Sequence, residues 1–258
     1  MIYVEDVYTL LLDELRKDVR GKALSVDEFN LIAKQVNLEL FEDYYKEFEK
    51  NIESSDTLAK FKVFDAQVVI TADTNNVAAV GVLPQDYYHI IGKPRKYTGA
   101  ITAWIDVVST YEHAGREDDY LTKATTTHPT CMIGGVEGTV PEYKRIRVHP
   151  YNIGSPIYID YLKVPATPFL DYYENDSELT YTYLDEGLTV SVPLGYTYRD
   201  GTAGGAAVSV YSYTINFDWD DEDLSLLMAK FFKVMGVKIP DEILLQAGMM
   251  NESKITGK

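Results

Sequence analysis

The sequence predicts an α+β fold, in which an N-terminal helical hairpin and a C-terminal helix pack as a bundle beside a mainly antiparallel β domain. Apolar residues recur at spacings of three and four near both ends of the 258-residue chain, whereas they alternate with polar residues in its middle. We therefore expect a helical hairpin over residues 1–57, a β-rich domain over 58–219, and C-terminal helices with a tail over 220–258 that pack on the N-terminal helices. Amphipathic helices with one apolar stripe need such a partner, because they are not stable alone in water.

Two helices are predicted in the N-terminal block. Gly21 is suited to end the first helix, because glycine readily takes the left-handed conformation that follows a helix. Ser25 and Glu28 have the spacing of a capping box at the start of the second helix. The apolar faces comprise Val4, Val7, Tyr8, Leu11, Leu12 and Leu15 in the first helix, and Phe29, Ile32, Val36, Leu40, Tyr44 and Phe48 in the second.

The middle block has the pattern of strands and turns. Strands are expected over residues 61–70 and 76–82, and a long β-rich stretch over 97–111, where a helix remains an alternative. Residues 146–163 predict a Tyr-rich hairpin, because two alternating segments flank a turn that contains Gly154 and two prolines. A second hairpin is expected over residues 181–192, with its turn at 185–187.

Two further features end the β-rich block. Residues 195–205 hold four glycines and little bulk, which predicts a flexible, exposed loop that projects from the domain. Residues 208–219 predict a last strand with two different faces. One face is apolar and the other consists of Ser, Thr, Asn and Asp; the apolar face comprises Tyr211, Tyr213, Ile215, Phe217 and Trp219.

A C-terminal helix is expected to begin at Asp220 and to end at Gly236. Acidic residues fill its first turn, where the helix dipole favours them, and lysines lie near its last turn. A shorter helix should follow from Pro240 to about Gly248, and residues 249–258 should form a mobile tail. The buried stripe of the main helix comprises Leu224, Leu227, Met228, Phe231 and Met235.

Composition limits the classes of function. The formal net charge is −16, which disfavours broad attraction to nucleic acid or to an anionic membrane. The single cysteine, Cys131, allows no internal disulfide, and the N-terminal segment lacks the basic region of a signal peptide. No apolar run is long enough to span a membrane, so we expect a soluble protein that is made in the cytoplasm. The 21 tyrosines favour half-buried sheet faces and protein interfaces.

The metal-binding patterns in the sequence are weak. His128 and Cys131, with His113 and Asp118 upstream, lack the paired spacings of a structural zinc site. His149 is expected to point to solvent from its strand. The acidic segment 218–223 lacks the Gly and Glu positions of an EF-hand, and acids at a helix N-terminus explain it better.

Catalytic motifs were not found either. The histidines lie outside any nucleophile setting, and the Gly-rich segment 200–205 lacks the Lys-Ser/Thr of a phosphate-binding loop. We therefore predict a protein that is not an enzyme and that holds no cofactor and no metal.

The order of features along the chain resembles that of the head–tail connector proteins, also called adaptor or neck-ring proteins, of tailed bacteriophages, especially short-tailed and crAss-like phages. Two helices precede Leu83-Pro-x-Asp86-Tyr and Trp104, and an acidic helix ends the pattern at Gly236. The segments between them are Glu117–Leu121, His128–Ile133, Ile146-x-Val-x-Pro150, Ile157-x-Ile-x-Tyr161 and Val164-Pro165.

The resemblance implies a structural virion protein in the neck or tail. Such subunits form rings, usually twelvefold, beneath the portal protein, contact neighbouring tail or neck proteins, and surround the passage for DNA without binding it specifically. We infer that the acidic charge helps DNA to pass. The predicted protein interface comprises Tyr158, Tyr161, Tyr172, Tyr173, Gly201, Gly204, Gly205, Met249, Met250 and Ile255. The alternative is a tail protein that binds a carbohydrate or a receptor, since exposed aromatic residues suit that role as well.

Overall fold

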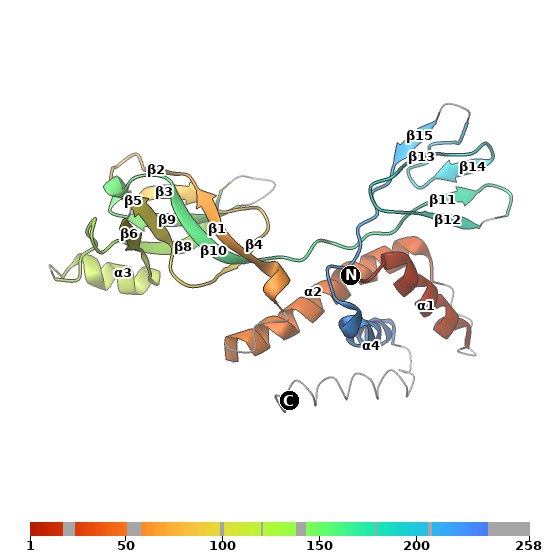
Figure 1. Ribbon diagram of the computed structural model, residues 1–258, viewed down its shortest axis with the longest axis horizontal. Helices are drawn as coiled ribbons and strands as arrows, with labels where there is room; N and C mark the ends of the chain where they lie inside the picture. The colour runs from red at the N-terminus through yellow and green to blue at the C-terminus, as the bar shows by residue number, and fades with distance from the viewer. Residues whose placement is uncertain are drawn as a thin grey trace. The chain divides into compact units, whose positions relative to one another are not determined.

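The protein is described here from a computed structural model, which covers residues 1–17, 24–50, 58–98, 101–119, 121–137, 143–178, 180–205 and 208–236. The chain divides into two compact units (Figure 1). Unit 1 combines Met1–Ser54 with Pro165–Lys258, and unit 2 is the continuous segment Ser55–Val164. Helices and mostly antiparallel strands are both present, which confirms the α+β class. The β-rich block predicted over residues 58–219 is divided between the two units, because residues 165–219 join the helices.

The helices of unit 1 agree with the sequence pattern. They are α1 (Val4–Lys17), α2 (Val26–Lys50) and α4 (Leu224–Met235). Ser25 and Glu28 form the predicted capping box: the Glu28 amide donates to Ser25 Oγ at 3.2 Å, and the Ser25 amide donates to Glu28 Oε2 at 3.3 Å. Gly236 adopts the left-handed conformation (φ 67°) that ends α4. Gly21 and the segments predicted as a short helix (240–248) and a tail (249–258) lie outside the described residues.

Aromatic rings join the three helices into the predicted bundle. Phe29 of α2 stacks on Phe231 of α4, with ring centroids 5.5 Å apart and planes 10° apart. Tyr8 of α1 lies 5.0 Å from the Phe29 ring, and its hydroxyl donates to the Leu24 carbonyl at 2.8 Å. Such ring pairs contribute beyond their buried area, so Phe29 is the centre of this core.

The strands of unit 1 form two small sheets, one of order β12-β11-β14 and one of β13-β15. The predicted hairpin over residues 181–192 is wrong, because its two arms pair with strands from elsewhere in the sequence. The turn at 185–187 thus connects two sheets. The bounds are β11 (Asp171–Asn175), β12 (Tyr181–Leu184), β13 (Thr189–Ser191), β14 (Tyr196–Tyr198) and β15 (Ser209–Tyr211).

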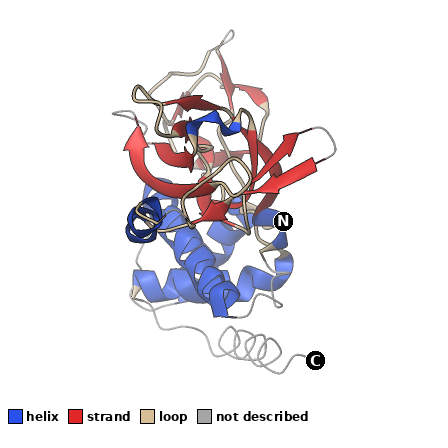
Figure 2. Cartoon of the chain, turned by 90° about the vertical axis from the view of Figure 1, so that its left-hand side faces the viewer, coloured by secondary structure: helices blue, strands red, loops and turns tan. Residues whose placement is uncertain are grey.

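Unit 2 consists mainly of strands, with one short α-helix, α3 (Thr110–Glu117), and two single turns of 3-10 helix among its described residues (Figures 1 and 2). One sheet contains β1 (Lys62–Val68), β4 (Tyr87–Ile90), β5 (Arg95–Thr98), β6 (Ile101–Trp104) and β10 (Ile157–Lys163). The other has the order β2-β3-β9-β8-β7, with β2 (Ile70–Ala72), β3 (Ala79–Val82), β7 (Asp106–Val107), β8 (Thr130–Glu137) and β9 (Tyr143–His149). All pairs are antiparallel except β7 with β8.

The Tyr-rich hairpin predicted over residues 146–163 is also wrong. Its two arms, β9 and β10, belong to different sheets and do not pair with each other. Ile146 and Val148 of β9 meet Ile157 and Ile159 of β10 in one buried cluster. Placing the arms in separate sheets lets both apolar rows face a shared core, whereas one flat hairpin would leave them without an opposing layer.

The β-rich stretch predicted over residues 97–111 is interrupted. It contains the end of β5, then β6 and β7, and α3 begins at Thr110. Ser109 caps α3, because its Oγ accepts the Glu112 amide at 3.1 Å. None of the helices in the described ranges combines the length and the apolar character that a membrane span requires.

Candidate protein-interaction surface

The first part of the last predicted strand buries its polar face instead of its apolar one. Ser212, Thr214 and Asn216 are buried, while Tyr211, Tyr213 and Ile215 are exposed by 54%, 58% and 37%. Only residues 209–211 belong to β15, although Ile215 and Phe217 make isolated bridges to Phe169 and Ile2. Phe217 and Trp219, at the end of the apolar face, are buried. We call Tyr211, Tyr213 and Ile215 the aromatic strip.

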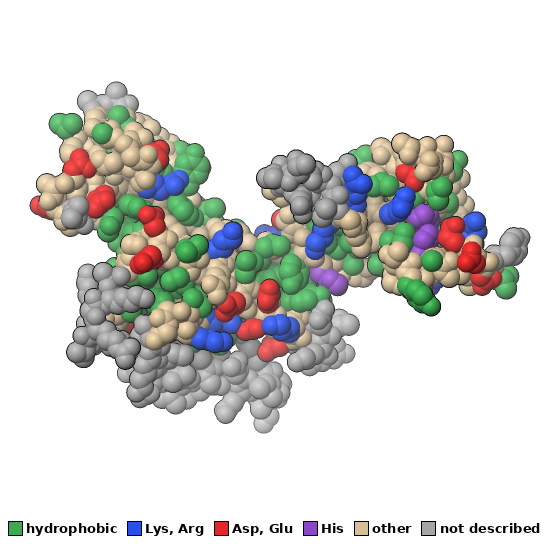
Figure 3. All heavy atoms as spheres, turned by 180° about the vertical axis from the view of Figure 1, so that it is seen from behind, with side chains coloured by type: hydrophobic (Ala, Val, Ile, Leu, Met, Phe, Trp, Pro, Cys, Tyr) green, Lys and Arg blue, Asp and Glu red, His purple; other side chains and the backbone are tan. Residues whose placement is uncertain are grey.

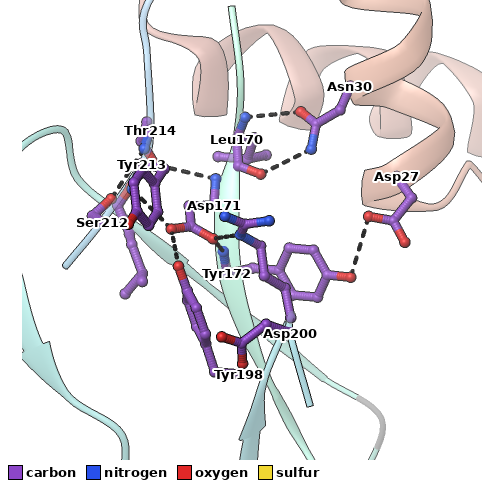
Figure 4. A network of polar contacts seen from close by, with 12 residues as sticks. Asp27, Asn30, Leu170, Asp171, Tyr172, Tyr198, Asp200, Ser212, Tyr213 and Thr214 are labelled. Atoms are coloured by element: carbon purple, nitrogen blue, oxygen red, sulfur yellow. Dashed lines mark hydrogen bonds and ion pairs between the residues drawn. The ribbon is translucent and has the colours of Figure 1, made fainter. Parts of the chain in front are cut away.

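Hydrogen bonds to β11 and its neighbours explain why the polar face is turned inward. Asp171 of β11 is fully buried, and its Oδ2 accepts the Tyr198 hydroxyl at 2.6 Å and the Tyr213 amide at 2.9 Å (Figure 4). The Asp171 amide donates to Thr214 Oγ1 at 3.1 Å, and that hydroxyl donates to the Leu184 carbonyl at 2.5 Å. Because buried polar groups need hydrogen-bond partners, the Thr214 hydroxyl is turned toward these two backbone groups.

Arg199 neutralises the charge of Asp171. Its Nε lies 2.6 Å from Asp171 Oδ1, and its guanidinium lies over the rings of Phe169 at 4.8 Å and Tyr213 at 5.5 Å. A buried carboxylate is stable only when it is paired and hydrogen-bonded, and both conditions hold here. Burial, and then the hydrogen bond to Asp171, raise the pKa of Tyr198 to about 12. The network therefore fixes the backbone from which Tyr213 projects.

Amide side chains connect this network to the helices. Asn30 of α2 bonds both backbone groups of Leu170: its Nδ2 donates to the carbonyl at 3.0 Å, and its Oδ1 accepts the amide at 2.8 Å (Figure 4). Asn216 accepts the Val4 amide at 3.0 Å, next to the start of α1. The segment that carries the aromatic strip is thus held at its C-terminal end by the start of α1, and β11, which bonds this segment, is held by α2.

The aromatic strip offers apolar contact area with hydroxyl groups at its surface. The rings of Tyr211 and Tyr213 lie 6.0 Å apart in an edge-to-face arrangement. Further hydrophobic side chains are exposed on both units, as Figure 3 shows. Tyr is common in protein interfaces, because it combines a large rigid ring with a polar group at low cost in side-chain entropy. The arrangement is suited to contact with another molecule.

Two tyrosines predicted as interface residues lie on β10 in unit 2. Tyr158 is half-buried, and its ring packs against Tyr97 with centroids 4.9 Å apart. Tyr161 is buried in the core of unit 2, where its hydroxyl donates to Asp86 Oδ1 at 2.8 Å. The Tyr161 side chain is therefore a core residue of its own unit and offers no surface for a partner.

The two tyrosines predicted on β11 are half-buried and neighbour the polar network. Tyr172 meets Tyr181 edge to face at 5.1 Å, and its hydroxyl reaches Asp27 at 3.4 Å. Tyr173 faces Tyr196 at 5.3 Å and packs against the small core around Leu184. Both residues contribute chiefly to the internal order of unit 1.

The flexible loop predicted over residues 195–205 is wrong, because this segment contains β14, which pairs with β11. A Cβ added at Gly204 would lie 1.8 Å from the Pro193 carbonyl oxygen, so this glycine permits a close approach of two backbones. Gly201 has φ 88° in an exposed turn, and Gly205 donates its amide to Val192 at 3.1 Å. The glycines therefore permit a tight turn. Of the three predicted as interface residues, Gly201 is exposed, whereas Gly204 and Gly205 are half-buried.

The other predicted interface residues, Met249, Met250 and Ile255, lie outside the described residues. The sequence reasoning missed the outward orientation of Tyr211 and Tyr213. A signal was available in Ser212, Thr214 and Asn216, since short polar side chains can be buried when hydrogen-bond partners are near. The partner of Thr214, the backbone amide of Asp171, lies about forty residues away in the sequence, which hides the relation.

His149 is a further correction. It is only 4% exposed, in contrast to the expected orientation toward solvent, although it lies on the face of β9 opposite to Ile146 and Val148. Its ring lies 4.1 Å from that of His113, between centroids. Burial, and then the neighbouring His113, lower the pKa of His149.

No model of a known protein family matches the chain, and no curated protein is significantly similar to it in sequence.

Proposed function

We propose that the protein is a structural subunit of a tailed bacteriophage, which assembles into a ring as a head–tail connector between the portal and the tail. The order of motifs along the chain, from the N-terminal helices to the acidic C-terminal helix, supports this reading. The observation that carries it is the aromatic strip, because Tyr211 and Tyr213 point outward while their polar neighbours are buried.

The aromatic strip is a costly arrangement for a subunit that remains alone. Two tyrosine rings and Ile215 stay in contact with water on a segment whose alternate positions are buried. A second copy of the chain that covered the strip would remove this apolar area from water. Tyrosine hydroxyls at the rim of such an interface would keep hydrogen bonds to solvent.

The charge of the subunit agrees with a DNA passage. A formal charge of −16 per chain would be multiplied in a ring, twelvefold by the resemblance, and phosphates would be repelled from its bore. The portal above and tail or neck proteins below would be the partners of the two ring faces. The segment with Met249, Met250 and Ile255 is proposed as a contact to the portal, because methionine adapts to irregular surfaces.

The mass and symmetry of the protein test this proposal. Native mass spectrometry and negative-stain microscopy of the purified protein at increasing concentration should show a closed ring. The double variant Tyr211→Ser/Tyr213→Ser should remain monomeric, because the contact area is lost while the hydrogen bonds of Asp171, which involve only the backbone amide of Tyr213, are kept. Tyr111→Ser is the matched control, since Tyr111 is 92% exposed and lies on α3 of unit 2. A wild-type protein that stays monomeric or forms trimers would argue against the connector.

The second candidate is a tail protein that binds a carbohydrate or a receptor. The exposed pair of Tyr211 and Tyr213 favours it, since aromatic rings stack on the apolar faces of sugars. A glycan array separates the two functions. Binding that is lost in the double variant, together with a monomeric or trimeric protein, would replace the connector by this alternative.

A further inference from the structure

Two imidazoles and a carboxylate converge in unit 2. His113 and Glu117 come from α3, and His149 ends β9, yet one ligand atom of each lies within 4.8 Å of the other two. His113 Nε2 is 3.9 Å from Glu117 Oε1. Figure 3 shows His side chains at the surface of unit 2, with Asp and Glu side chains beside them.

The spacing on α3 explains how this cluster forms. Residues four apart in a helix lie on one face, so His113 and Glu117 project from the same side of α3. That helix packs against β8, and β9 is paired with β8. His149 is the last residue of β9, where it reaches the same region. The topology of unit 2 therefore brings together residues 36 positions apart in sequence, in a pattern without any short metal-binding motif.

His149 is oriented as a metal-binding histidine would be. Its Nε2 is buried and has no hydrogen-bond partner among the described residues. A buried polar atom without a partner is unfavourable, so a ligand that bonds this nitrogen would be stabilising. A neutral imidazole nitrogen is the commonest metal ligand that proteins supply.

A second buried polar atom lies beside the cluster. Thr130 of β8 is the direct cross-strand partner of His149, so both side chains are on the same face of the sheet. Thr130 Oγ1 is buried and also lacks a hydrogen-bond partner in the described part of the chain. A buried hydroxyl without a partner is unfavourable, and a water molecule bound to a metal would satisfy it.

We infer that His113, Glu117 and His149 bind one divalent transition-metal ion, with zinc as the best fit, and that Thr130 hydrogen-bonds a water in its fourth position. Two imidazole nitrogens and one carboxylate oxygen suit zinc, whereas calcium and magnesium prefer oxygen ligands alone. Ligand atoms around tetrahedral zinc are roughly 3.3 Å apart, for bonds of about 2.0–2.1 Å. Small rotations of the partly exposed His113 and Glu117 side chains are enough to reach that separation, although Glu117 must release Lys123, which lies 3.9 Å away.

Metal titration tests this inference independently of ring assembly. Untagged full-length protein is treated with a chelator, dialysed, and titrated at pH 7.5 with zinc by calorimetry and with cobalt(II) by visible absorption. We expect one equivalent to bind, the cobalt complex to show the visible bands of a low-coordinate site, and zinc to raise the melting temperature.

Variants decide whether the bound ion is at this site. His113→Ala and Glu117→Gln should each weaken binding at least about tenfold. His128→Ala is the matched control, because His128 is exposed and lies outside the cluster. The test does not depend on a variant of the buried His149, and circular dichroism confirms that the two helix variants are folded. If wild type binds no zinc, or binds it as His113→Ala does, or takes up several weak equivalents in every variant, the inference is wrong.

Discussion

The carboxylate of Asp171, which is fully buried, lies 2.6 Å from Nε of Arg199 and is the acceptor around which the strands of unit 1 are ordered. Arg199 remains partly exposed and covers the Phe169 ring. The pair therefore connects the interior of unit 1 to its surface.

Asp171→Ala should strongly destabilise unit 1. The change leaves the Arg199 charge without its partner and removes the acceptor of the Tyr198 hydroxyl and the Tyr213 amide. We expect a loss of about 3–5 kcal/mol in the free energy of unfolding. The measurement is urea denaturation followed by the fluorescence of buried Trp219, in a Trp104→Phe background that removes the other tryptophan. Asp221→Asn, at an exposed position, is the control; an equal effect of both changes would contradict the role of Asp171.

Thr214→Val, on the buried face of this segment, should destabilise the protein more than a change on the exposed face. Valine keeps the shape of threonine but removes the hydroxyl that bonds both Asp171 and Leu184. A cost of about 1–3 kcal/mol in unfolding free energy is expected, because the Asp171 amide and the Leu184 carbonyl lose a partner. The neighbouring change Tyr213→Ser should cost less stability, since that side chain is exposed and loses its ring contact with Arg199. Urea denaturation curves measure the stability of both variants. A larger loss of stability in Tyr213→Ser than in Thr214→Val would contradict the prediction.

Stability should fall at high pH, and Tyr198 should contribute to the fall. The folded protein holds the pKa of Tyr198 at about 12, above the ordinary value of 10 for the unfolded chain. A raised pKa contributes stability that is complete below pH 10 and is lost as the pH rises from 10 to 12. Unfolding free energies measured across that window should decline less steeply in Tyr198→Phe. Thr197→Val, a change on the same strand that removes no ionisable group, should keep the wild-type slope.

In unit 2, two carboxylates that share one arginine should differ in importance. Arg95 contacts Asp160 through two bonds of 2.6 and 2.8 Å and Asp65 at 2.6 Å, yet the Asp160 side chain is 17% exposed and that of Asp65 58%. Asp160→Asn should cost more stability than Asp65→Asn, because solvent screens the exposed pair to about 0–1 kcal/mol. Hydrogen exchange of the β10 amides reports on this unit alone. Equal acceleration of exchange in both variants would contradict the ranking.

Local features of the fold were predictable, whereas strand partners were not. The capping box at Ser25 and the helix end at Gly236 depend on residues within a few positions, so the pattern is complete in the sequence. The strands that pair with β10 are β1, about 95 residues away, and β4 and β5, so the hairpin expected from neighbouring segments was wrong. The same limit applies to Thr214, whose inward orientation depends on Asp171.

The candidate sites show the same limit. His113, Glu117 and His149 have no recognisable joint spacing, because a helix and a strand end bring them together only in the folded unit. The tyrosine content did point to contact surfaces. The tyrosine content could not identify which rings are exposed. Tyr161 and Tyr213 both lie in segments of alternating residues, yet Tyr161 is buried and Tyr213 is exposed.

The division of the chain has a consequence for how the protein is made. Unit 2 is continuous, so it can fold on the ribosome as soon as residue 164 has emerged, whereas unit 1 is split around it. Phe29 needs Phe231, and Asn37 needs Trp219, whose indole Nε1 donates to it at 2.7 Å. The apolar faces of α1 and α2 therefore remain uncovered while about 180 further residues are translated. During that interval α1 and α2 are natural substrates for chaperones, and slow codons before residue 219 would prolong the exposure.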